Sequence, residues 1–573
     1  MSDETVGLPQ ASPHEWCARG EAVSGLSISQ YLIRRLGECG VRHVFGIPGD
    51  YVLAFYAMLE NSPLRTIGCT REDCAGFAAD AYARLNGIGA VCVTYGVGGL
   101  SLCNSIAGAY AEKSPVVVIS GAPGLVERTR HPLLHHRVND FATQYEVFRR
   151  LSVAATELND PATAFREIDR VLAAVMRYRR PGYIELPRDL VTFVPSGSHI
   201  RTTVAESSDA DVLAEALAEA VRRLSAARRP VILADVEIHR FGLQAQVLAL
   251  AETSGIPIAA TVLGKSVVSE THPLFVGVYE GAMSREEVTA FVEESDCVLL
   301  LGAYMTDMNL GIYTANLDPS RCIFAESDTL RISRHHFPGV LLRDFVQGLI
   351  DAGIKAPRRE LPPQPRATDD FKPGLGTPLT ITRLMARLNQ SLDGSMVVIA
   401  DVGDALFAGA DLVIHRQTEF FSSAYYASMG FAVPAALGTM TARPDLRAIV
   451  LVGDGAFQMT GMELSTLVRY GFAPIVIVLD NKGYGTERLL DREDRAFNDI
   501  HPWNYHKLPE VLGGGRGYEV RSEDEFDRAL RTALADTSGM SLIQAHLGLK
   551  DCSRALQQLG RHLRANVESA GGQ

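Results

Sequence analysis

The sequence predicts an α/β protein of three domains, each a mostly parallel sheet flanked by helices. The first observation is that strand-length apolar runs alternate with amphipathic helical runs along the whole chain. The second is that these runs are continuously apolar, which is typical of parallel strands buried on both faces. The third is the length of 573 residues, which exceeds a single core and predicts roughly three domains.

The predicted strands follow one another through all three thirds of the chain. They are AVCVTYG (90–96), PVVVISG (115–121), PVILADV (230–236), DCVLLLGA (296–303), MVVIADVG (396–403), AIVLVGDG (448–455) and PIVIVLDN (474–481). None approaches the roughly 20 apolar residues of a membrane-spanning helix. We therefore expect no membrane partner.

Two segments interrupt the alternation and are interpreted as linkers between domains. The first is VPSGSHIRTTVAESSDAD, at 194–211, and the second is the proline-rich and charged run at 354–378. They predict an N-terminal domain at 24–193, a central domain at 205–353 and a C-terminal domain at 376–550.

The composition is that of a soluble globular protein, with 47% apolar and 21% charged residues. The net charge of −12, without a basic stripe, argues against a nucleic-acid partner. The nine cysteines show no regular spacing, which predicts reduced thiols and a cytoplasmic protein. The acidic start, MSDETVGLPQASPHEW, lacks the apolar core of a signal peptide.

The most informative motif spans 452–488. One predicted strand ends at Gly453-Asp454-Gly455, a helix with Leu464, Leu467 and Val468 on one side follows, and the next strand ends at Asp480-Asn481. Asp454 and Asn481 thus both follow parallel strands, at the edge where open α/β sheets bind ligands. A carboxylate, an amide oxygen and a carbonyl from the Asn-Lys-Gly turn are hard oxygen ligands. With phosphate oxygens and water they would complete an octahedral Mg²⁺ site.

A bare GDG is also an ordinary turn, but GDG followed by a helix, a strand and Asn-x-Gly resembles the thiamine diphosphate-dependent enzymes. The resemblance implies that fold, thiamine diphosphate and Mg²⁺ as cofactors, and Asp454, Asn481 and Gly483 as metal ligands. It also places Gly453, Gly455, Ala456 and Tyr484 against the cofactor. One departure is visible, because the family usually has two asparagines where this chain has Asp480-Asn481.

The stretch TREDCAGFAADAYARLNG, 70–87, looks like the family segment that carries a glutamate facing the aminopyrimidine, and Glu72 is the matching residue. Its carboxyl group would stabilise the imino tautomer that removes the proton from the thiazolium carbon. The alternative is an acidic residue placed at a helix N-terminus.

Two further segments resemble the family. In SSAYYASMGFAVPAALG, 422–438, Met429 matches the residue that holds the cofactor bent, and the Ala427 carbonyl matches the acceptor for its amino group. The alternative for Met429 is ordinary core filling. In 96–123, small residues would let helices approach closely at a subunit interface; these are Gly98, Gly99, Ala107, Gly108 and Ala109.

His135 and His136 stand side by side in HPLLHHRVND. Neighbouring side chains point about 100° apart on a helix, so two adjacent histidines rarely bind one metal ion. The pair resembles that of the 2-keto acid decarboxylases within the family, as do Asp50 in VFGIPGDYVL and Glu487 in NKGYGTER. The resemblance implies proton relays made of these four residues. The second pair, His335-His336, matches nothing and is interpreted as two surface histidines.

The implied reaction is non-oxidative decarboxylation of a 2-keto acid to an aldehyde and CO₂ through a thiamine diphosphate enamine. Small residues at Gly485-Thr486, with Leu490 and Phe407 as apolar walls, predict an aryl-pyruvate or a long branched substrate. Alternatively, turn geometry alone, and not the substrate pocket, determines the residue types at Gly485 and Thr486. The resemblance further implies a homo-oligomer, a dimer of dimers, whose sites combine two subunits.

Two rival functions stay open. One is a carboligase of the acetolactate synthase type, with the same cofactor. In such relatives the central domain can carry FAD, but no clear dinucleotide fingerprint occurs here. The other is a cofactor-binding relative without catalysis that serves assembly.

Overall fold

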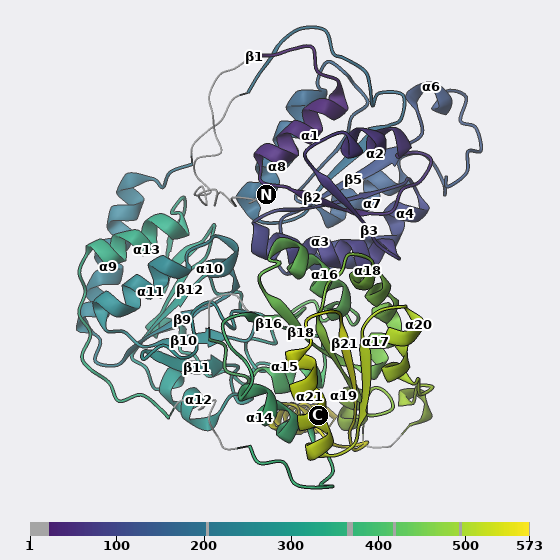
Figure 1. Ribbon diagram of the computed structural model, residues 1–573. Helices are drawn as coiled ribbons and strands as arrows, with labels where there is room; N and C mark the ends of the chain where they lie inside the picture. The colour runs from purple at the N-terminus through teal and green to yellow at the C-terminus, as the bar shows by residue number, and fades with distance from the viewer. Residues whose placement is uncertain (1–21, 202–205, 364–370, 416–419, 492–494, 572–573) are drawn as a thin grey trace, which may run out of the picture.

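Three sheets organise the computed structural model, each in a different third of the chain (Figure 1). The structure describes residues 22–201, 206–363, 371–415, 420–491 and 495–571. The predicted α/β class with mostly parallel sheets is confirmed, and every apolar run named above contains a strand.

The N-terminal sheet is fully parallel and has the order β3-β2-β4-β5-β7-β6. Its strands are β2 (His43–Gly46), β3 (Arg65–Gly68), β4 (Gly89–Val93), β5 (Val116–Ala122), β6 (Ala154–Glu157) and β7 (Gly182–Pro187). Its helices are α1 (Ile28–Glu38), α2 (Leu53–Glu60), α3 (Glu72–Asn86), α4 (Val97–Ser101), α5 (Cys103–Ala111), α6 (Leu125–Arg128), α7 (Thr143–Leu151) and α8 (Ala164–Tyr178).

The central sheet has the order β11-β10-β9-β12-β13-β14-β15, in which the β13–β14 and β14–β15 pairings are antiparallel and the others are parallel. Its strands are β9 (Pro230–Ala234), β10 (Ile258–Thr261), β11 (Phe275–Tyr279), β12 (Cys297–Leu301), β13 (Cys322–Ala325), β14 (Leu330–Ile332) and β15 (His335–Phe337). Its helices are α9 (Ala210–Ala226), α10 (Val236–Arg240), α11 (Gln244–Ser254), α12 (Glu286–Glu293) and α13 (Leu342–Asp351).

The C-terminal sheet is parallel and has the order β17-β16-β18-β19-β21-β20. Its strands are β16 (Met396–Ala400), β17 (Phe420–Phe421), β18 (Arg447–Gly453), β19 (Ile475–Asp480), β20 (Arg516–Val520) and β21 (Ser541–His546). Its helices are α14 (Ile381–Asn389), α15 (Asp404–Gly409), α16 (Ala432–Ala442), α17 (Asp454–Thr460), α18 (Leu464–Arg469), α19 (Gly485–Leu490), α20 (Leu508–Val511), α21 (Glu523–Ala535) and α22 (Arg554–Gly571).

The N- and C-terminal sheets are joined through α3 and α16, which pack against each other where the two thirds meet (Figure 1). A Cβ on Gly438 of α16 would lie 1.9 Å from the Ala78 carbonyl oxygen of α3, so glycine is required for this close approach. Arg84 of α3 forms a buried ion pair with Asp80 and donates to the Ser422 carbonyl at 2.7 Å. This packing fixes the segment after Ser422, which carries Ala427 and Met429.

Two expectations differ from the structure. The first linker contains β8 (His199–Ile200), which pairs antiparallel with β1 (Ala22–Val23), and His199 Nε2 also lies 2.9 Å from Asp169 Oδ2. The single helix expected after Gly455 is divided into α17, a 3-10 turn at Gly461–Glu463, and α18. Leu464 and Leu467 are nevertheless fully buried on α18, as the pattern predicts.

Candidate active site

Asp454 lies at the C-terminal end of β18, as the first residue of α17. Its side chain is buried; Oδ1 accepts from the Gly455 N–H at 2.8 Å and Oδ2 from the Gly483 N–H at 3.0 Å. Burial, with a contribution from neighbouring Asp480, raises the pKa of the Asp454 carboxyl to about 7. A bound cation would remove this cost, because it favours the ionised carboxylate.

Asn481 and Gly483 follow β19 directly, in the turn that faces Asp454. A Cβ on Gly485 would lie 2.3 Å from Asn481 Nδ2, so only glycine leaves room for this amide. Arg488 donates to the Asn481 and Lys482 carbonyls at 3.0 and 2.8 Å and pairs with Asp499 at 2.6 Å. Sequence reasoning missed Arg488, which holds the predicted metal-binding turn in place.

The cofactor residues expected around this turn lie close together. Tyr484 is the N-cap of α19, and a Cβ on Gly455 would lie 2.7 Å from its ring. Ala456 is buried on α17 beside them. Gly453 differs, because a Cβ there would meet nothing within 4 Å. Open space beside Gly453 and three oxygen donors from Asp454, Asn481 and Gly483 suit a diphosphate with a divalent cation.

Glu72 is the first residue of α3, so it occupies the helix N-terminal position that the alternative interpretation gave it. That position does not exclude a role toward a cofactor, because the side chain is only half-buried. Its Oε1 lies 3.7 Å from the position of a Cβ on Gly98.

Ala427 has a φ of +56°, which is rare for a residue with a side chain, and it is exposed. Its amide donates to the Ser423 carbonyl at 3.0 Å. Met429 is half-buried against the core shared by the N- and C-terminal sheets. Asp401, buried at the end of β16, accepts from the Gly430 and Ala432 amides at 3.0 and 2.9 Å and fixes the chain just after Met429.

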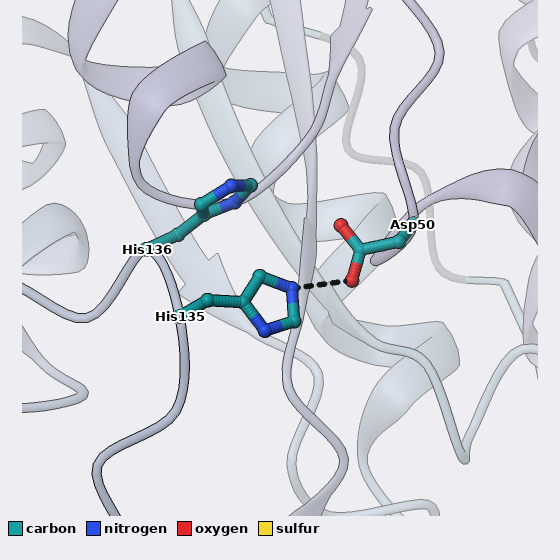
Figure 2. A group of neighbouring side chains, drawn as sticks. All are labelled: Asp50, His135 and His136. Carbon is teal, nitrogen blue, oxygen red and sulfur yellow. Dashed lines mark hydrogen bonds and ion pairs between the residues drawn. The ribbon is translucent and has the colours of Figure 1, made fainter.

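Asp50, His135 and His136 form a cluster at the carboxyl edge of the N-terminal sheet, as Figure 2 shows. Asp50 Oδ2 lies 2.7 Å from His135 Nε2, and one ligand atom from each residue lies within 4.8 Å of the others. The imidazole rings are 4.8 Å apart and nearly perpendicular. A φ of +67° at His136 turns the chain between the two residues, so both rings lie beside Asp50 in one cluster.

His136 has a second notable feature: its Nδ1 is buried and has no hydrogen-bond partner within the described ranges. The loop around it approaches Gly96 so closely that a Cβ there would lie 2.3 Å from the His136 carbonyl oxygen. Gln144 accepts the Gly96 N–H at 2.7 Å. Gly96 and Gln144 thus hold the loop of the cluster in place, and His136 Nδ1 is left without a partner among the described residues.

Sequence reasoning missed Tyr51 and Arg188. The buried Tyr51 ring stacks on His135, with centroids 4.8 Å apart, and Arg188 lies 4.9 Å from the centroid of the Tyr51 ring. Arg188 also lies 3.9 Å from Asp50 and forms an ion pair with Glu127. Tyr51 directly follows Asp50, which is a usable signal, whereas nothing in the sequence marks Arg188.

The remaining predicted residues lie on α15 and α19. Glu487 is exposed, and the structure gives it no contact with the histidine cluster within one chain, as far as the described residues extend. Thr486 Oγ1 lies 3.2 Å from the position of a Cβ on Gly403, and Leu490 is half-buried. Phe407 is buried among Met283, Ala555, Leu556 and Leu559, which dock α22. Its role as a substrate wall stays a prediction.

His335 and His336 lie on the edge strand β15, far along the chain from these groups. Both are exposed, and His335 Nδ1 pairs with Glu219 at 2.7 Å. This ion pair agrees with the interpretation as surface histidines.

Comparison with known proteins identifies the family. The sequence matches three thiamine pyrophosphate enzyme models: the N-terminal TPP binding domain at 26–142, the central domain at 217–350 and the C-terminal TPP binding domain at 401–545. The chain belongs to the thiamine pyrophosphate enzyme family. Thiamine diphosphate is its cofactor, as the resemblance implied.

Full-length relatives within the family are similar to this chain. An indole-3-pyruvate decarboxylase of Azospirillum brasilense is 36% identical over 537 residues, which cover 91% of this chain and 95% of the relative. Alpha-keto-acid decarboxylases of Mycobacterium avium (strain 104) and Mycobacterium tuberculosis (strain ATCC 25618 / H37Rv) are each 35% identical and cover 93% of this chain and 96% of theirs.

Proposed function

We propose that this chain catalyses the non-oxidative decarboxylation of a 2-keto acid to an aldehyde and CO₂. The observation that carries the proposal is similarity over more than nine-tenths of the chain to relatives named as decarboxylases of such acids. The Asp50–His135–His136 cluster supports it, since the reaction must deliver and remove protons after CO₂ departs. No described helix is long and apolar enough to cross a membrane.

Mg²⁺ and the diphosphate would be held by Asp454, Asn481 and Gly483, beside Gly453 and Tyr484. The support is the buried Asp454 carboxylate, whose Oδ2 accepts from the Gly483 N–H at 3.0 Å, and the position of Asn481 in the same turn directly after β19. When bound, thiamine diphosphate supplies an electron sink for the charge left by departing CO₂. Glu72 would hold the aminopyrimidine, with Ala427 and Met429 placing the ring.

The proton-handling groups have separate tasks. Asp50 Oδ2 orients His135 through Nε2, and stacking on Tyr51 fixes the plane of the ring. His136 keeps a buried, unpartnered Nδ1 that can hold or release a proton. Glu487 would supply the fourth proton-handling group from another copy of the chain.

We further propose a homo-oligomer, a dimer of dimers, in which a second subunit covers each site. The Asp50 and His135 side chains are 41% and 58% exposed in one chain, although water must be excluded during the reaction. Large apolar side chains near the cluster are also exposed: Leu53, Val97, Leu133 and Val138. Such exposed patches mark interaction surfaces, and the mass in solution by light scattering tests this assembly.

The substrate would be an aryl-pyruvate or a long branched keto acid, admitted by the small Thr486 and bounded by Leu490 and Phe407. The support is the small size of Gly485 and Thr486 at the start of α19, where Thr486 Oγ1 lies 3.2 Å from the position of a Cβ on Gly403. A pocket wall two or three methylenes smaller changes substrate preference by about 1–3 kcal/mol for each group.

The direct test removes the metal ligand. Wild-type protein, stripped with a chelator and reloaded with thiamine diphosphate and Mg²⁺, should form aldehyde from phenylpyruvate. Asp454→Ala should neither retain the cofactor in calorimetry nor recover activity. Asp445→Ala, which removes an exposed carboxylate paired with Arg443, is the matched control. Full activity in Asp454→Ala would contradict the site.

A further inference from the structure

Asp480 occupies the position before Asn481, where the family fingerprint usually has another asparagine. Its side chain is 3% exposed. Oδ2 accepts from Gln544 Nε2 at 2.8 Å and lies 3.0 Å from His546 Nδ1. Oδ1 is buried and has no hydrogen-bond partner in the part of the chain that the structure describes. The chain therefore keeps a buried charge where a neutral amide of the same shape would fit.

The carboxylate is held by a row of side chains across three neighbouring strands. Asp480 on β19 pairs in register with His546 on β21, and β20 lies on the other side of β21. His546 Nε2 lies 2.9 Å from Glu519 Oε1 of β20. Two carboxylates thus flank one imidazole, so the row stays negative overall even with a protonated ring. The pairing of β19, β21 and β20 fixes the positions of these three residues relative to one another.

The row reaches the proposed metal site through strand alignment. Gly453 and Leu479 are partners in the parallel pair of β18 and β19, so Asp454 and Asp480 are the next residues on adjacent strands. Neighbouring strands lie about 4.8 Å apart. Asp480 also directly precedes Asn481 in the chain. A cation bound by Asp454 and Asn481 would therefore lie close to this second carboxylate.

We propose that Asp480 is a positioning residue that strengthens divalent-cation binding at the Asp454–Asn481–Gly483 turn. It acts through its negative charge, which Gln544 and His546 hold in place through Oδ2. The inference rests on the metal site of the proposed function. Residues behind the ligands orient them and raise their affinity for the ion, and their loss costs about 10–100-fold in metal affinity.

Asp480→Asn tests the role of charge, because it preserves shape and introduces the residue usual in the family. The full-length chain is stripped of metal, saturated with thiamine diphosphate and titrated with MgCl₂ in a calorimeter. Glu519→Gln is the matched control, since it removes one charge from the far end of the same row. Asp480→Ser also removes the charge, but with a smaller side chain. The test therefore does not depend on the correct folding of a single variant.

Asp480→Asn and Asp480→Ser should weaken Mg²⁺ binding about 10-fold or more, while Glu519→Gln changes it much less. Relative to each variant's own metal-free melting temperature, the rise on adding Mg²⁺ should be smaller in Asp480→Asn and Asp480→Ser than in the wild type. Wild-type affinity in Asp480→Asn, or equal losses in Asp480→Asn and Glu519→Gln, would overturn the proposal and leave the decarboxylase function intact. Unchanged Mg²⁺ binding in Asp454→Ala would overturn the metal site and this role together.

Discussion

At the scale of single residues, the site depends on backbone conformations that residue type does not reveal. His136 and Ala427 have φ values of +67° and +56°, a region that residues with a Cβ rarely adopt. Ideal helix or strand geometry therefore does not describe how His135 and His136 both come to lie beside Asp50. Residue type did point to side chains that lie together in the fold, because Asp50 and His135 meet across 85 positions of sequence and His136 lies beside them.

Substitutions of Glu72 should impair a different step of the reaction from substitutions of His135 and His136. Glu72→Gln should retain cofactor but slow proton exchange at the thiazolium carbon by about 10²–10⁴-fold, because an amide cannot exchange a proton as a carboxyl does. His135→Gln and His136→Gln should leave this exchange fast and impair later steps. Exchange into D₂O, quenched with acid and followed by NMR, measures the first effect.

The control for Glu72→Gln is Asp73→Asn, which changes the next residue on α3, weakens its pair with Arg71 at 2.9 Å and keeps an oxygen that can accept from the Cys74 amide. Equal slowing of exchange in Glu72→Gln, His135→Gln and His136→Gln would show that the assigned roles are wrong.

At the scale of elements, the strands were predictable because continuous apolar runs have few alternatives in an α/β chain. The ends of β18 and β19 placed Asp454 and Asn481 at one edge of the C-terminal sheet, as parallel pairing requires. Strand order was not predictable, because it depends on long-range pairing. The apolar pattern did not predict that the helix after Gly455 is divided into α17 and α18. The buried positions of Leu464 and Leu467 are compatible with one helix or with two.

The helix α19 carries the substrate prediction. Thr486→Leu should lower the ratio of kcat/KM for phenylpyruvate over pyruvate by about 10-fold or more, because added methylenes fill space next to the reacting carbon. Leu490→Ala, which enlarges the opposite wall, should move the ratio the other way. Steady-state kinetics on both acids gives the ratio, and an unchanged value in both variants would show that α19 does not line the pocket.

At the scale of the whole molecule, the central and C-terminal thirds meet at a cavity that charged side chains line. Glu280, at the end of β11, is 3% exposed and lines a cavity of about 40 Å³ together with Asp411 of the C-terminal third and Arg554 of α22. Its Oε2 has no partner among the described residues. Domain limits, oligomeric state and cytoplasmic location stay predictions at this scale, because composition and one chain do not fix them.

Glu280 should make the stability of the protein depend on pH. Burial, aided by Asp411, raises the pKa of its carboxyl to about 7, whereas an unfolded glutamate ionises near pH ~4.3. The unfolded chain therefore binds fewer protons between these values, and the free energy of unfolding falls as pH rises. Glu280→Gln removes this ionisable carboxyl group. From pH 5.5 to pH 8, the free energy of unfolding of the variant should therefore fall by about 2 kcal/mol less than that of the wild type.

Chemical denaturation at pH 5.5 and pH 8 measures this difference. Glu60→Gln, at an exposed glutamate on α2, should follow the wild type at both values. A Glu280→Gln variant whose stability falls with pH as steeply as that of the wild type would contradict the prediction.

The central claim is that the chain releases CO₂ and an aldehyde from a 2-keto acid. The most direct measurement counts CO₂, aldehyde and acyloin from the holoenzyme on pyruvate, phenylpyruvate, indolepyruvate and a long branched keto acid. We predict one aldehyde for each CO₂, little acyloin, and the highest kcat/KM for an acid larger than pyruvate. Acyloin as the main product would identify a carboligase, and no CO₂ from any acid would contradict the claim altogether.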